Sequence, residues 1–349
     1  MVPANTGTGR ADHLPLQDVQ SYRIEVLYAS PDMNLVSEIR YGKFNGRDTA
    51  ELLIISEDGY RLMSTSGKVA KTRRFSNVGP ERVAYAKMVG AAATAPSAFV
   101  GSRGGNTIAV YDWSGQLLWG RTTEPWTIPF SADLHGNGSY QIIVPERSHG
   151  VLAYSRDGTV SQFLTRESCL NATAVDFGAA ADAKIAMQVQ KPGKLAEILV
   201  IDGNGRSIAR WSPEFKFYEF TAAASAGGEM AGRLVFLDRT ERNARFVTTD
   251  IFGKSAIAYQ APSGEQFAVP HACLLGDGVR DKSMVVLASS TGGAHRFGVF
   301  LYGKDAEMLY RYIGQEDADS ILVLPTEACK KNPYFVIGAR NRVLKFEPA

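Results

Sequence analysis

A tight turn that recurs along the chain at nearly constant spacing is the feature that most constrains the fold. Five of its six copies end in glycine, which readily adopts the positive φ that such hairpins require. These glycines follow one another after 48, 43, 47 and 48 residues, and the sixth copy ends in alanine 53 residues later. A period of this length is typical of repeat architectures. The turns occupy residues 64–67, 112–115, 155–158, 202–205, 250–253 and 303–306.

A short apolar segment also recurs, in seven copies. The copies read ELLIIS, SAFVGS, QIIVPE, KIAMQV, RLVFLD, MVVLAS and YFVIGA. Each unit consists of four short strands joined by turns, which is the composition of a β-propeller blade. Helical periodicity is missing where an alternation of strands and helices would require it. We therefore predict an all-β fold, a seven-bladed β-propeller in one domain over residues 21–349.

The seventh unit has only three strands, SILVLPT, YFVIGA and RVLKFEP. An open sheet edge promotes aggregation, so the ring should be closed by another segment. The sequence SYRIEVLY at residues 21–28 has the pattern of a strand, and we predict that residues 21–29 complete the last blade. Residues 1–20 are polar and lack the apolar core of a signal peptide, so we expect a flexible N-terminal segment.

The first strand of each unit should line the central channel, where seven strands converge. The candidates VAYAKM, FSADL, NATAVDF, FTAAAS and AVPHACL are rich in Ala, Ser and Thr. Crowding at the axis explains these small side chains. His271 lies on one of these strands and is a candidate for the channel wall.

Charge and motifs exclude several classes of function. The chain has 38 Lys plus Arg and 36 Asp plus Glu, a net charge of +2, which argues against a nucleic-acid-binding protein. No apolar run approaches the ~18 residues that a transmembrane helix needs. Three cysteines cannot form a disulfide framework. The motifs GxxxxGK[ST], GxSxG, HExxH and CxxC are all missing, so we assign no catalytic and no metal-binding residue.

Two segments resemble known propeller repeats. Residues 110–119, VYDWSGQLLW, are similar to the repeat of quinoprotein (PQQ-type) propellers, with a weaker copy at residues 200–205 and Trp211. This resemblance implies that the tryptophan packs between neighbouring blades. Residues 132–144 resemble the FG-GAP (VCBS-type) repeat, with a relative at residues 42–48.

The FG-GAP resemblance implies a calcium site formed by acidic residues at alternate positions. The matching positions here are Asp133, His135, Asn137 and Gln141, which offer a single carboxylate. Calcium prefers several carboxylate oxygens. We therefore expect a hydrogen-bonded turn at this position. We predict no cofactor for the chain, although the FG-GAP resemblance suggests calcium.

Candidate binding residues lie in two sets of loops that should emerge on the same face. The B–C loops, which join the second and third strands, carry a basic residue in six of seven units. The D–A loops, which lead into the next unit, all contain an acid, and one also contains Trp126, which could contact a sugar or peptide. The candidates are Arg103, Trp126, Arg147, His149, Arg239, His295, Arg296 and Arg340.

These loop charges have two interpretations. The basic residues could form a ring that binds an anion or an acidic partner, since arginine suits bidentate capture of carboxylate or phosphate. Alternatively, basic and acidic loops pair across neighbouring blades, each pair contributing only ~0–1 kcal/mol. We favour pairing, because an acidic loop lies near each basic loop.

The sequence thus favours a non-enzymatic binding or scaffold module whose loop face holds a protein, peptide or glycan. The alternative is an enzyme at the channel mouth, a hydrolase, lyase or quinoprotein-like oxidoreductase, with His149, His271, His295 and Asp133 as acid–base candidates. Fold alone does not decide between them. The compartment is periplasmic or extracellular if a signal was removed, and cytoplasmic otherwise; the oligomeric state stays open.

Overall fold

The computed structural model describes most of the chain from residue 21 onward. Its described residues form 28 strands and no helix. The N-terminal segment 1–20 lies outside the described residues. The described ranges are 21–44, 49–76, 83–90, 98–103, 105–125, 127–175, 182–189, 196–217, 219–225, 230–239, 244–254, 256–261, 267–276, 280–290, 295–324 and 333–349.

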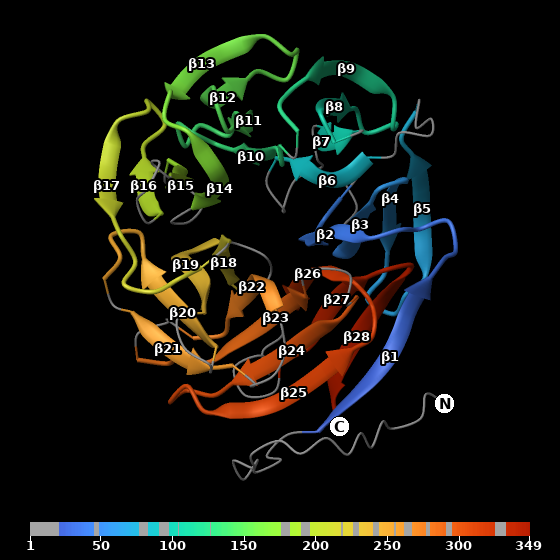
Figure 1. The fold of residues 1–349 in the computed structure, drawn as a ribbon. Helices are drawn as coiled ribbons and strands as arrows, with labels where there is room; N and C mark the ends of the chain where they lie inside the picture. The colour runs from blue at the N-terminus through green and yellow to red at the C-terminus, as the bar shows by residue number, and fades with distance from the viewer. Residues whose placement is uncertain are drawn as a thin grey trace.

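The strands form seven antiparallel blades arranged in a ring, as predicted (Figure 1). The innermost strands of neighbouring blades contact one another around the central channel. The first four blades are β2 (Val36–Gly42), β3 (Glu51–Ser56), β4 (Gly59–Met63) and β5 (Val69–Arg74); β6 (Val83–Val89), β7 (Ala98–Arg103), β8 (Thr107–Tyr111) and β9 (Leu117–Thr122); β10 (Phe130–Ala132), β11 (Gln141–Glu146), β12 (Gly150–Tyr154) and β13 (Val160–Thr165); and β14 (Cys169–Val175), β15 (Lys184–Val189), β16 (Glu197–Ile201) and β17 (Ser207–Trp211).

The remaining three blades follow the same order from the channel outward. They are β18 (Phe220–Ser225), β19 (Met230–Asp238), β20 (Arg245–Asp250) and β21 (Ile257–Gln260); β22 (Phe267–Leu274), β23 (Met284–Ser290), β24 (Phe297–Tyr302) and β25 (Met308–Gly314); and β26 (Ala318–Val323), β27 (Phe335–Ala339), β28 (Arg342–Pro348) and β1 (Tyr22–Ala29). Unexpectedly, β18 and β22 also pair in parallel, which joins the fifth and sixth blades into one eight-stranded sheet.

The N-terminal strand closes the ring, which confirms the prediction for the last blade. Strand β1 pairs antiparallel with β28, from Tyr22 opposite Pro348 to Ala29 opposite Arg342 (Figure 1). On the other side it contacts the first blade, where the buried Arg61 donates a hydrogen bond to the Tyr28 hydroxyl at 3.3 Å. The closing strand therefore connects the last blade to the first.

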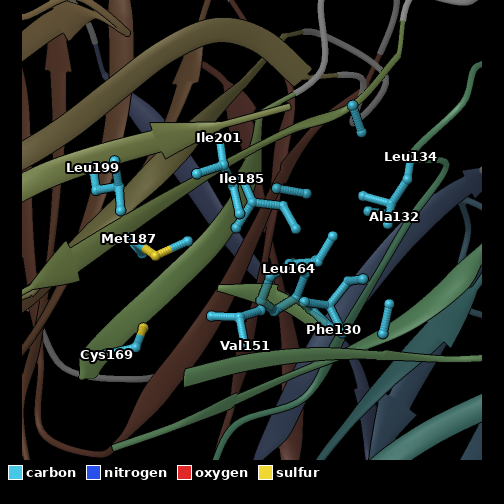
Figure 2. Packing of buried hydrophobic residues seen from close by; sticks show 14 of the residues in the cluster. Phe130, Ala132, Leu134, Val151, Leu164, Cys169, Ile185, Met187, Leu199 and Ile201 are labelled. Atoms are coloured by element: carbon cyan, nitrogen blue, oxygen red, sulfur yellow. The ribbon is translucent and has the colours of Figure 1, made fainter. Parts of the chain in front are cut away.

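Apolar cores lie between the blades. Because strand side chains alternate, each middle strand sends residues into both neighbouring interfaces. In β11, Ile142 packs toward the second blade and Ile143 toward the fourth. Figure 2 shows the interface between the third and fourth blades, where Phe130, Val151 and Met187 are buried together. This double-sided burial explains why the middle strands read as continuous apolar runs.

In the first five blades, the recurrent turn seen in the sequence packs against the preceding blade. In the second, fourth and fifth blades an aspartate Oδ1 accepts two backbone N–H groups of the turn at 2.8–2.9 Å. The turn glycine then lies against the outer strand of the preceding blade. Trp119 covers Gly158, and Trp211 covers Gly253; their indole nitrogens donate to turn carbonyls at 2.7 and 3.1 Å. The predicted packing of these tryptophans between blades is confirmed.

Polar side chains of the innermost strands hydrogen-bond across the blade interfaces. Each donates to a backbone carbonyl of the adjacent inner strand, so the serines and threonines do more than relieve crowding. These bonds are Ser37 to Ala86 at 2.8 Å, Ser131 to Met88 at 3.0 Å, Asn171 to Phe220 at 2.9 Å, Thr221 to Pro270 at 2.6 Å and Ser320 to Val36 at 2.9 Å.

A methyl group at the turn glycine should disturb the docking between blades. Gly253 has a φ of +73°, and a Cβ there would lie 2.5 Å from the Trp211 ring. Gly138 has a φ of +80° and open space around it, so it controls for backbone strain alone. We expect Gly253→Ala to lower the free energy of unfolding by about 1–3 kcal/mol more than Gly138→Ala. Equal losses in urea denaturation would contradict this role of the turn.

Acid should loosen the closing strand through Glu347 on β28. Hydrogen bonds, first from Tyr334 and also from Lys345 and Arg23, lower the pKa of Glu347 from 4.5 to about 2. A lowered pKa contributes stability above the unfolded pKa of 4.5, and that contribution is lost as pH falls toward 2. Urea denaturation across this range should show that Glu347→Gln removes this part of the pH dependence. Glu25→Gln, at an exposed position, is the control and should retain this pH dependence. If the free energy of unfolding varies with pH equally in the wild type, Glu347→Gln and Glu25→Gln, the assignment to Glu347 is contradicted.

Candidate functional site

Where the structure describes them, the B–C and D–A loops lie on one face, as predicted, and three pairs of them are joined by hydrogen bonds. The backbone N–H of Arg239 donates to Lys216 O at 2.8 Å, and that of Arg340 donates to Asp317 O at 2.8 Å. In the third blade, the N–H of Ser148 donates to both carboxylate oxygens of Glu124, at 3.1 and 3.0 Å. These bonds hold the loops that surround the channel mouth.

Three of the seven predicted basic residues lie within 4.0 Å of an acid at the rim of this face. His149 Nδ1 lies 3.0 Å from Glu124 and 3.4 Å from Glu146. His295 Nδ1 lies 2.9 Å from Asp317, and Arg340 lies 4.0 Å from the same carboxylate. At these three residues the rim shows the pairing across neighbouring loops that we favoured.

The other predicted residues occupy different environments. Arg103, at the end of β7, is half-buried, and its Nε has no hydrogen-bond partner among the described residues. Arg239 is half-buried after β19, and Arg296 is exposed directly before β24. Trp126 lies outside the described residues. Arg147 is exposed, and it makes no hydrogen bond or ion pair with the part of the chain that the structure describes.

A pocket of about 710 Å³ opens on the loop face at the channel mouth. Arg147 lines it from the loop after β11, and Glu219 lines it from the residue before β18. The innermost strands β6 and β14 form its inner wall. The lining residues are Tyr85, Ser102, Gly105, Asn106, Pro125, Thr127, Ile128, Pro145, Arg147, Cys169, Leu170, Asn171, Ala172 and Glu219. A volume of this size is within the range of ligand pockets.

Titratable side chains meet where the pocket reaches the channel. Glu219 is exposed to the pocket, but the surrounding protein removes part of its hydration. This desolvation raises the pKa of Glu219, and the negative charge of Asp319 raises it further. The charge of His271 has the opposite effect on the pKa of Glu219. Burial, and then the carboxylates of Asp319 and Glu219, raise the pKa of Tyr85 to about 12. Tyr85 therefore stays a neutral phenol near pH 7.

Below this point lies a smaller cavity of about 180 Å³, lined by residues of the innermost strands. His271 and Asp319 line it, and their side chains lie 3.3 Å apart. His271 therefore faces the channel, as the sequence suggested, whereas the acid–base candidates His149, His295 and Asp133 do not line this cavity or the pocket. Sequence reasoning missed Tyr85, Glu219 and Asp319. A signal was present for Tyr85, because its bulk interrupts an inner strand of small residues.

The turn that resembles a calcium loop is held by hydrogen bonds of its own. Asp133 Oδ1 accepts the N–H of Asn137 at 3.2 Å, and Oδ2 accepts that of Gly138 at 2.7 Å. Among the described residues, no group of three or more His, Cys, Asp or Glu side chains is arranged to hold a metal ion. Our expectation of a chain without cofactor stays a prediction.

The described cysteines are buried thiols. Burial raises the pKa values of Cys169 and Cys273 to about 12, which leaves both thiols protonated and unreactive near neutral pH. Cys329 lies outside the described residues. The described ranges also contain no helix that could span a membrane.

Comparisons with known proteins agree with the fold. BBS1N in a complex with ARL6DN has a TM-score of 0.56 at 9% identity, over 94% of this chain and 97% of that one. The Neurospora crassa Pan2 WD40 domain has a TM-score of 0.51 at 11% identity, over 92% and 95%. Chaetomium thermophilum Raptor has a TM-score of 0.59 at 11% identity, over 95% of this chain but only 29% of its own. No family model and no curated protein matches the sequence.

The chain is therefore a β-propeller. At 9–11% identity these structures show the fold alone. These comparisons do not show whether the repeat is of the quinoprotein or the FG-GAP type.

Removing the shared rim carboxylate should have little effect on stability. Asp317 pairs with His295 and Arg340, which are 59% and 52% exposed, so solvent screens both interactions. We expect Asp317→Ala to lower the free energy of unfolding by no more than about 1 kcal/mol. Asp238, which is only 3% exposed and bonds to Arg245 at 2.7 Å, serves as the comparison. Urea denaturation should show a larger loss for Asp238→Ala; the reverse order would contradict the argument.

Proposed function

We propose that this propeller is a non-enzymatic binding module that holds a protein, peptide or glycan at the channel mouth. The observation that carries the proposal is the 710 Å³ pocket, which opens on the loop face and contains an arginine without a described partner. Nearby on the rim, His149, His295 and Arg340 lie against carboxylates, whereas Arg147 in the pocket has bonding capacity left for a ligand. Seven packed blades hold the wall in place, which limits the entropy lost on binding.

The structural neighbours supply further support for a protein partner. BBS1N was solved in a complex with another protein, ARL6DN. The WD40 domains of Pan2 and Sif2 share the same fold at TM-scores of 0.51. We also propose that the repeat is of the quinoprotein type in its packing, a proposal supported by the docking of Trp119 and Trp211 on turn glycines.

An enzyme with a site in the channel is the second candidate. His271 lies 3.3 Å from Asp319, and the raised pKa of Glu219 would suit a general acid. These groups are close to the pocket, so a small substrate bound there could reach them. If the protein converts a small substrate, and both Glu219→Gln and His271→Gln abolish that activity, the result would favour an enzyme over a binding module.

Filling the pocket should remove binding. We expect a random peptide library or a glycan array to yield ligands for the protein, and we expect these ligands to be lost in Asn106→Trp, which places an indole in the pocket. Thr65→Trp, in the exposed turn on the opposite face, is the matched control and should leave binding unchanged. Ligands that bind Asn106→Trp as well as they bind the wild type would contradict the assignment of the site.

A further inference from the structure

Three polar side chains of the pocket have bonding capacity that the fold does not use. The side chains of Arg147, Tyr85 and Glu219 make no hydrogen bond to the described residues, although all three line the same pocket. Elsewhere on this face, His149 and His295 lie 2.9–3.4 Å from carboxylate oxygens. Polar groups held in a cavity without partners are the groups that a ligand can satisfy.

These groups are separated along the radius of the ring. Arg147 follows β11, the second strand of its blade, and so lies outward from the axis. Tyr85 is on the innermost strand β6, and Glu219 directly precedes the innermost strand β18. The pocket therefore has a basic outer end and an acidic inner end. A ligand with a single sign of charge would suit only one of them.

Apolar surface lies in the same pocket. Ile128 and Leu170 line it and are 39% and 38% exposed, which is high for large aliphatic side chains. Pro125 and Pro145 add rigid apolar wall next to them. Burial of this surface would contribute roughly 25 cal/mol per Å² to binding, independently of the charges.

We propose that the pocket binds an extended peptide segment of a protein partner in which an acidic and a basic residue flank an apolar one. The acidic side chain pairs with Arg147, the apolar side chain packs on Ile128 and Leu170, and the basic side chain points to Glu219 at the channel mouth. This inference rests on the proposed binding function and specifies its ligand. On the pocket wall, the Asn106 side chain can donate from Nδ2 to the peptide backbone, while its Oδ1 accepts from Thr107 Oγ1 at 3.5 Å.

The basic side chain is favoured at the inner end by more than one carboxylate. Asp319, on β26, acts on both Glu219 and Tyr85 and lies below them on the channel wall. His271, 3.3 Å from Asp319, and Lys87, which lines the same cavity, partly offset this charge. A cation that enters from the pocket would reach Glu219 first, because Glu219 lines the pocket and Asp319 lines the cavity beneath it.

A selection experiment tests the proposal before any natural partner is identified. A displayed library of random heptapeptides is selected on the wild type, on Arg147→Gln and on Glu219→Gln. Peptides selected on the wild type should contain an acid and a base on either side of an apolar residue. Selection on Arg147→Gln should lose the preference for the acid, and selection on Glu219→Gln should lose the preference for the base. Arg156→Gln and Glu25→Gln, at exposed positions away from the pocket, are the matched controls.

Affinities of the selected peptide then test each contact separately. We expect Arg147→Gln to weaken it about tenfold, and to have no further effect on a peptide whose acid is replaced by its amide. Some selected peptides could bind the wild type, fail to bind Asn106→Trp, and yet show no preference for an acid or a base. That result would overturn this inference and leave the proposed function standing. Peptides that bind equally well to Asn106→Trp, or a folded protein that selects none, would count against both.

Discussion

Apolar contact between neighbouring blades is the interaction on which the rest of the structure depends. A blade is buried on both faces, so no blade is stable without the next one, and the series must end where it began. Strand β1 meets this requirement by pairing with β28 and contacting the first blade. The turn glycines allow the outer strands to approach, as Trp211 does over Gly253. The circular arrangement then fixes where every loop emerges.

The channel and its mouth follow from that arrangement. Small polar residues on the inner strands allow the strands to converge and to bond across interfaces, as Ser320 does to Val36. Larger or charged side chains at the same depth then face the remaining space, which is the case for Tyr85, His271 and Asp319. At the rim, His149 and His295 lie against carboxylates of neighbouring loops. In the pocket at the mouth, Arg147 has no such partner among the described residues.

The repeat, the blade order and the closing strand could all be predicted from the sequence, because turn chemistry and alternation are local signals. The prediction for residues 21–29 needed only a count of strands, and β1 spans Tyr22–Ala29. The pocket could not be predicted in the same way. Whether Arg147 stays free while His149 pairs with Glu124 depends on where the loop after β9 meets the loop after β11, which no local pattern encodes. Glu219 was missed for the same reason, since its neighbours come from distant inner strands.

Amide hydrogen exchange along β1 and β28 tests ring closure most directly. If the two strands form one edge-paired unit, the amides of Tyr22–Ala29 that pair with β28 should exchange as slowly as their partners in Arg342–Pro348, and both should lose protection together under denaturant. Rapid exchange of the N-terminal strand beside a protected β28 would contradict a closed ring, and with it the arrangement of loops from which the pocket is built.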